Sequence, residues 1–198
     1  MPDLSRYADY VEHPRYGRGP RFTPDSWKGV LGFGGVRRFD DRPMAIPGTY
    51  VRADVSRQKW SVVPRAGYFD QDCGCVDCGR RFIWFAEEQK HWFEELKFDL
   101  AAWCVRCVEC RRRIHREKAL ADRYARVADA GPAAAPDDLL AGAAAGVRLI
   151  EQGVFGPKAH QRVRAALNRL PDDPELVAAA DRLRRRLDAA AERPEPTA

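Results

Sequence analysis

The chain has 198 residues, of which 45% are hydrophobic, and it carries a formal net charge of +5. This length allows one domain with appendages or two small domains, and the apolar content permits a core. The sequence offers no apolar run near the ~18 residues that a membrane span needs and no apolar signal region after Met1, so we expect a cytoplasmic protein that has no membrane partner.

The charge is distributed unevenly along the chain. Residues 1–65 carry 12 Lys/Arg against 7 Asp/Glu, residues 66–110 carry 5 against 9, and residues 111–198 carry 17 against 13. An acidic middle segment therefore lies between two basic flanks. Basic flanks can contact phosphates, although an arginine-rich composition explains the overall charge equally well.

Residues 1–66 are predicted to form an irregular, basic N-terminal arm. Turn-forming residues crowd His13–Phe22 and exclude a helix there. The same stretch mixes arginines with aromatic residues, which suits either base stacking or an extended arm laid across a folded module. Short strands are expected at residues 50–55 and 60–63.

Residues 67–116 are predicted to form a cysteine module. All six cysteines fall between Cys73 and Cys110, where Cys75-x-x-Cys78 and Cys107-x-x-Cys110 are separated by 28 residues. In a reducing compartment, clustered Cys-x-x-Cys pairs indicate metal ligands rather than disulfides. Four thiolates fill all four positions of the tetrahedral coordination that structural Zn²⁺ prefers. We therefore expect the metal to stabilise the fold of the module rather than to take part in a reaction.

The second cysteine pair has an alternative. Cys104-x-x-Cys107 has the same spacing as Cys107-x-x-Cys110, so Cys104 could replace Cys110 in the site. Cys73 is only two positions before Cys75, too close for the usual turn, and we interpret it as a bystander. The spacing alone leaves both ligand sets open.

The rest of the module and the C-terminal part show a regular pattern. Residues 80–85 are predicted to be a strand, and residues 86–97 a helix with one apolar face and a solvated His91. Four helices are then expected: one over about 111–130, one over 137–152, a third that ends at 170 and a fourth that ends at about 192. The predicted fold class is therefore α+β: a small zinc ribbon with three cysteine-bearing turns and one helix, then an all-helical bundle over 117–192 and a frayed tail, 193–198.

The motifs resemble a known family. Cys75-x-x-Cys78-Gly79-x-x-Phe82, then Glu88-Gln89-x-x-Trp92, then Arg106-Cys107-x-x-Cys110-Arg111 resembles the probable zinc-ribbon domain of uncharacterised bacterial proteins. The resemblance covers about residues 70–113, and residues 9–17 are similar to the start of longer members. It implies Zn²⁺ binding without an established activity, and it favours Cys107 and Cys110 over Cys104.

Three classes of function remain. A basic run after the second cysteine pair predicts a binding module that contacts nucleic acid or a nucleic-acid-associated machine: Arg111, Arg112, Arg113 and Arg116. The alternative is a protein–protein adaptor with a purely structural zinc. A rubredoxin-like iron protein or a thiol redox protein is a weaker hypothesis. No catalytic motif is evident, and a four-thiolate zinc has no open position for water, which makes an enzyme the least favoured class.

Overall fold

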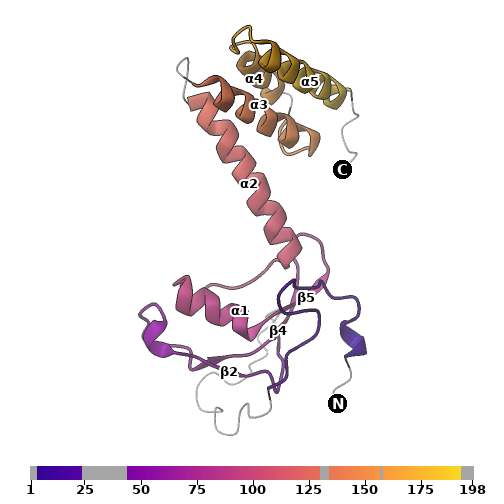
Figure 1. The fold of residues 1–198 in the computed structure, drawn as a ribbon. Helices are drawn as coiled ribbons and strands as arrows, with labels where there is room; N and C mark the ends of the chain where they lie inside the picture. The colour runs from indigo at the N-terminus through magenta and orange to yellow at the C-terminus, as the bar shows by residue number, and fades with distance from the viewer. Residues whose placement is uncertain (1–3, 24–43, 130–133, 157, 193–198) are drawn as a thin grey trace. The chain divides into compact units, whose positions relative to one another are not determined.

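The computed structural model describes residues 4–23, 44–129, 134–156 and 158–192. The chain divides into two compact units, Met1–Arg112 and Arg113–Ala198, which are treated separately below (Figure 1). The predicted tail, 193–198, lies outside the described residues. The finer predicted division into an arm, a zinc ribbon and a helical region stays a prediction.

The first unit is built on short antiparallel strands. Its three-stranded sheet has the order β1–β4–β5, formed by Met44–Ala45, Gln71–Gly74 and Arg81–Trp84. The longest pairing joins β4 to β5 and places Cys73 opposite Phe82. A second, two-stranded sheet pairs β2 (Val51–Arg52) with β3 (Gly67–Tyr68). Such short strands bury little surface alone, so the module depends on other contacts for stability.

The N-terminal residues extend the sheet region. After a single 3-10 turn, η1 (Ser5–Tyr7), the Val11 N–H donates to the Arg81 carbonyl at 2.8 Å along the edge of β5. A second 3-10 turn, η2 (Val55–Arg57), follows β2. Residues 60–63, which were expected to be a strand, are irregular, and Trp60 is 86% exposed. That strand prediction was wrong because this segment has no pairing partner among the described residues.

Helix α1 (Ala86–Lys90) begins at a buried carboxylate. Its N-cap residue, Phe85, has no capping side chain. Asp70 Oδ1 instead accepts from the Ala86 N–H at 2.7 Å, and Oδ2 accepts from the Arg21 N–H at 2.7 Å. Burial raises the pKa of Asp70 to about 6. One side chain from the loop before β4 thus fixes the start of the helix and the arm beside it.

The helix changes its winding after one turn. Residues His91–Glu95 (η3) form a π-helix, and Lys97 ends it with a φ of 56°. Phe85, Gln89 and Phe93 are buried as expected, and His91 is exposed. Leu96 is 47% exposed although the pattern placed it on the apolar face. The wider π-turn rotates the following residues, which carries Leu96 out of the core.

Aromatic rings surround Trp84 in the core of the first unit. The Trp92 and Trp103 rings lie 5.3 and 5.4 Å from the Trp84 ring, and Phe93 lies at 6.1 Å. The same cluster contains five of the six cysteines, at positions 73, 75, 104, 107 and 110. These five cysteines are therefore buried with the aromatic core, whereas Cys78 is exposed.

The second unit is entirely helical in its described residues. Helix α2 (Val108–Asp129) begins in the first unit and ends here, followed by α3 (Pro136–Glu151), α4 (Lys158–Leu167) and α5 (Pro174–Ala191). Asp173 caps α5 by accepting from the Glu175 and Leu176 N–H groups. Buried side chains of α3, α4 and α5 form one apolar cluster, including Val147, Val163 and Leu187.

Candidate metal centre

Four cysteine sulfurs converge at one point of the first unit. The Sγ atoms of Cys75, Cys78, Cys107 and Cys110 all lie within 4.8 Å of one another. A tetrahedral site with Zn–S bonds of about 2.3 Å needs sulfurs about 3.8 Å apart, and the Cys78 and Cys107 sulfurs are 3.9 Å apart. The four cysteines are therefore positioned to bind one metal ion.

The first cysteine pair occupies the turn between β4 and β5. The Gly79 N–H donates to the Cys75 carbonyl at 2.9 Å, and Gly79 has a φ of 70°. A residue with a side chain rarely adopts that φ, which explains the glycine after the second cysteine. The Cys75 N–H also donates to the Arg80 carbonyl at 3.0 Å. These bonds close the tight turn that carries both cysteines, of which Cys75 is buried and Cys78 is exposed.

The second pair occupies the start of α2. The Cys110 N–H points toward Cys107 Sγ at 3.5 Å, and the Arg111 N–H donates to the Cys107 carbonyl at 2.9 Å. The Val76 N–H donates to the Val105 carbonyl at 3.0 Å and joins the two cysteine-bearing turns. The free amides of a helix N-terminus favour negative charge, so this location suits a thiolate.

The surroundings of the sulfurs shift their proton affinities in different directions. Burial acts to raise the pKa of Cys75, but the amides of Cys107, Cys78 and Asp77 stabilise its thiolate and lower the pKa to about 6. Burial and the neighbouring thiols raise the pKa of Cys110 to about 12. Four sulfurs this close cannot all ionise without a cation between them, because like charges repel. The arrangement therefore fits a bound cation.

The other two cysteines lie outside this cluster. Cys104 is 2% exposed, and its Sγ donates to the Arg106 carbonyl at 3.3 Å. Cys73 is equally buried, and its Sγ donates to the Gln71 carbonyl at 3.5 Å. Burial raises the pKa of both thiols, that of Cys104 to about 12. Both behave as buried apolar residues, and the geometry groups Cys110, rather than Cys104, with the other three sulfurs.

Charge pairs surround the cysteine cluster. Arg80 pairs with Glu109 at 2.7 Å, and Arg106 pairs with Asp77 at 2.9 Å. Each of these pairs links one cysteine-bearing turn to the other. They neutralise the basic side chains nearest the sulfurs.

The basic run after Cys110 has unequal members. Arg111 Nη1 lies 2.6 Å from Glu88 Oε1, and its guanidinium lies over the Trp92 ring, 5.2 Å from the centroid. Arg113 pairs with Glu117 at 3.3 Å. Arg112 and Arg116 are exposed and also make contacts within the chain. Arg111 is therefore partly buried against Glu88 and Trp92, whereas the other three arginines are exposed.

The structural roles of two buried acidic residues of the first unit were missed by the sequence reasoning. Glu88 and Asp70 are 7% and 0% exposed, and each joins segments far apart in the chain. His13 Nε2 also lies 3.9 Å from Glu88 Oε1, and burial lowers the pKa of that histidine. Glu88 belonged to the Glu-Gln motif of the family pattern, which was the available signal. Asp70 had none, because its role depends on amides from two distant segments.

One comparison with known proteins matches the cysteine module. Residues 69–119 match a protein-family model described as a probable treble clef domain. No curated protein and no solved structure matches the chain. The match and the cysteine cluster confirm the predicted zinc-ribbon-like resemblance and the α+β fold class. This part of the chain is therefore similar to a zinc-binding treble clef module and has four cysteines positioned to bind a metal ion. Within the described residues, no helix has the length and apolarity required to cross a membrane.

Proposed function

We propose that Cys75, Cys78, Cys107 and Cys110 hold one structural Zn²⁺. The observation that carries this proposal is the convergence of exactly those four sulfurs within 4.8 Å. Four thiolates fill the coordination sphere of zinc and leave no position for a substrate or water, so the metal is non-catalytic. Zinc binding of this type contributes roughly 10–16 kcal/mol in finger peptides. That is enough to organise strands of two to four residues.

Iron is the competing metal. A rubredoxin-like site has two equivalent Cys-x-x-Cys turns, whereas here only the first turn contains a left-handed glycine and the second runs directly into α2. This asymmetry favours zinc. Purified protein should be colourless and contain about one zinc per chain by elemental analysis. A red protein that contains iron would overturn the zinc assignment.

We further propose that the protein is a protein–protein adaptor in a reducing, cytoplasmic environment. The ion pairs around the sulfurs support this role, because they leave little uncompensated positive charge on the cysteine-bearing turns. A nucleic-acid surface needs free lysines and arginines to displace counterions. The adaptor hypothesis therefore stands ahead of nucleic-acid binding.

Nucleic-acid binding is the second candidate, and the exposed start of α2 supports it. Arg112, Arg113 and Arg116 lie along that helix segment and can follow a phosphate backbone. Arg111 is not available, because it is paired with Glu88. A gel-shift series with single- and double-stranded DNA and RNA tests this candidate. Binding that weakens steeply with salt and is lost in the triple alanine variant of the three arginines would replace the adaptor proposal.

A further inference from the structure

The second unit has a groove between the end of α2, α3 and α4. Its volume is about 360 Å³. Val127, Ala143 and Ala166 form an apolar floor, and Tyr124, Arg162 and Arg169 stand at its rim. Ligand pockets range over roughly 300–1,000 Å³, so this groove lies at the small end and has room for one or two side chains of a partner.

The two arginines lie on α4 and directly after it. Arg162 and Ala166 are four residues apart on α4, and Arg169 lies in the turn that follows the end of the helix at Leu167, where its N–H donates to the Ala166 carbonyl at 3.2 Å. Both arginines are exposed, whereas Ala166 is buried. The groove thus presents two positive charges with an apolar strip between them.

These two charges lack the acidic partners that other arginines of the unit have. Arg164, Arg184 and Arg186 form ion pairs with Asp188, Asp181 and Glu151. Among the described residues, no acidic side chain forms a salt bridge with Arg162 or Arg169. A ligand that covers this groove removes both the apolar floor and the two charges from water. Binding is favourable when the ligand offers apolar surface to the floor and negative charge to the arginines.

The hydroxyl of Tyr124 adds a polar group inside the groove. It is buried, and Arg162 lies close enough for its charge and a hydrogen bond to oppose the rise that burial causes in the Tyr124 pKa. A hydroxyl that accepts from a guanidinium still has its own hydrogen to donate. A carboxylate in the groove would accept a hydrogen bond from it.

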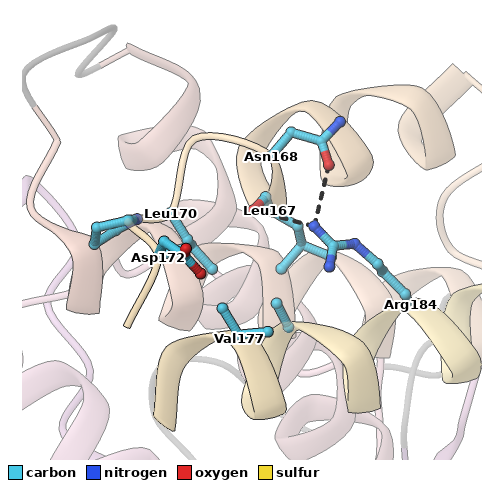
Figure 2. A pocket seen from close by; sticks show the side chains of 8 residues that line it. Leu167, Asn168, Leu170, Asp172, Val177 and Arg184 are labelled. Carbon is cyan, nitrogen blue, oxygen red and sulfur yellow. Dashed lines mark hydrogen bonds between the residues drawn. The ribbon is translucent and has the colours of Figure 1, made fainter. Parts of the chain in front are cut away.

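A second cavity in the same unit shows the contrast. Figure 2 shows Arg184 of α5 directed at the loop after α4, where its Nη2 donates to Asn168 Oδ1 at 3.1 Å. This cavity of about 270 Å³ is bordered by Leu170, Asp172 and Val177. Its arginine is already used to hold α5 against α4. The arginines of the larger groove have no such structural task.

We propose that the groove between α2, α3 and α4 binds an acidic amphipathic helix of a partner protein. An apolar side chain of that helix rests on the floor formed by Val127, Ala143 and Ala166, and carboxylates on either side of it meet Arg162 and Arg169. The apolar strip between the charges disfavours the polar backbone of a nucleic acid. The proposal rests on the adaptor role and specifies the chemistry of its partner.

The test uses the full chain and a labelled helical peptide with Glu at two positions seven residues apart and Leu between them. Fluorescence anisotropy should show saturable binding, weakened at least tenfold by Arg162→Ala or Arg169→Ala. Arg185→Ala is the matched control, because Arg185 is exposed and lies outside the groove. Its affinity should equal that of the native chain.

Charge reversal makes the test sharper. A double change to Arg162→Glu and Arg169→Glu should abolish binding of the Glu peptide and allow binding of a matching Lys peptide. Absence of binding by the native chain, or equal losses in the groove and control variants, overturns the groove proposal. The adaptor role is tested separately by a pull-down from the native cell with and without nuclease. Loss of all protein partners after nuclease treatment would overturn it.

Discussion

Arg111, the residue after Cys110, forms an ion pair with Glu88 in which Nη1 and Oε1 are 2.6 Å apart. The side chains are 20% and 9% exposed, so the pair is largely withdrawn from water. The Arg111 guanidinium also lies over the Trp92 ring. This pair connects the start of α2 to α1, and it makes an arginine expected to contact phosphate a structural residue instead.

Glu88→Gln should therefore destabilise the first unit. The change leaves the mostly buried guanidinium of Arg111 without its counter-charge, which we expect to cost about 1–3 kcal/mol. Urea unfolding followed by tryptophan fluorescence measures the cost. Glu109→Gln is the control, because its pair with Arg80 is about half exposed on both sides and contributes little. Equal stability of the two variants would contradict the structural role of Arg111.

Cys110→Ser should release the metal, whereas Cys104→Ser should retain it. The first change removes one of four clustered sulfurs, and the second alters a buried thiol outside that cluster, whose Sγ donates to the Arg106 carbonyl. Elemental analysis after gel filtration should give well below one zinc for the first variant and about one for the second. The reverse result would place Cys104, with Cys107, in the metal site.

Metal removal should unfold the first unit and spare the second. All five tryptophans precede residue 113, so tryptophan fluorescence reports on the first unit alone: Trp27, Trp60, Trp84, Trp92 and Trp103. A high-affinity zinc chelator should shift this fluorescence to the red, while the far-ultraviolet circular dichroism of α3, α4 and α5 persists. Loss of the helical signal together with the fluorescence change would show that the units do not fold separately.

The sequence predicted those features that depend on local spacing. Cys-x-x-Cys pairs, the glycine after Cys78, and the apolar periodicity of the C-terminal helices are all set by residues a few positions apart. The predicted helix over 111–130 matches α2, Val108–Asp129, closely, and that over 137–152 matches α3, Pro136–Glu151. The choice between Cys104 and Cys110 needed the family pattern, because both have the same spacing to Cys107.

Features that depend on contacts between distant segments could not be predicted. The π-turn at His91–Glu95 has no pattern in the sequence, and it alone decides that Leu96 is exposed. The run of arginines after Cys110 looks uniform, yet only Arg111 faces Glu88. Charge in a sequence gives the number of basic residues, whereas the pairing of each one depends on the fold.

Asp70 should make the stability of the first unit depend on pH. Burial raises its pKa from 3.8 to about 6, so the folded chain binds this proton more tightly than the unfolded chain. Its contribution to stability is fully present below pH ~3.8 and is lost as the pH rises through about 6. The unfolding free energy of the native chain, relative to that of Asp70→Asn, should rise by about 1 kcal/mol from pH 7 to pH 5.

The chemical shift of the Asp70 carboxyl carbon checks the same prediction directly. It should titrate near pH 6 in the folded protein, and a midpoint near 3.8 would refute the prediction. Asp70→Asn should also lower stability at all pH values. An amide cannot accept hydrogen bonds with both ends, so either the Ala86 or the Arg21 N–H loses its acceptor.

Gly142→Ala should destabilise the second unit although alanine favours helices. A Cβ at position 142 would lie 2.3 Å from Val127 Cγ2 and 2.8 Å from Val127 Cβ, so α2 and α3 would have to separate. Overpacking of this kind costs about 1–3 kcal/mol, which exceeds the gain of about 1 kcal/mol in helix propensity. Thermal unfolding followed by circular dichroism should show a lower midpoint.

Adding Val127→Ala to Gly142→Ala removes Val127 Cγ2, the nearest clashing atom, and leaves only the Cβ approach of 2.8 Å. Part of the clash is relieved, so the double variant should be more stable than the sum of the two single changes predicts. Strict additivity would show that Gly142 does not set the distance between these helices.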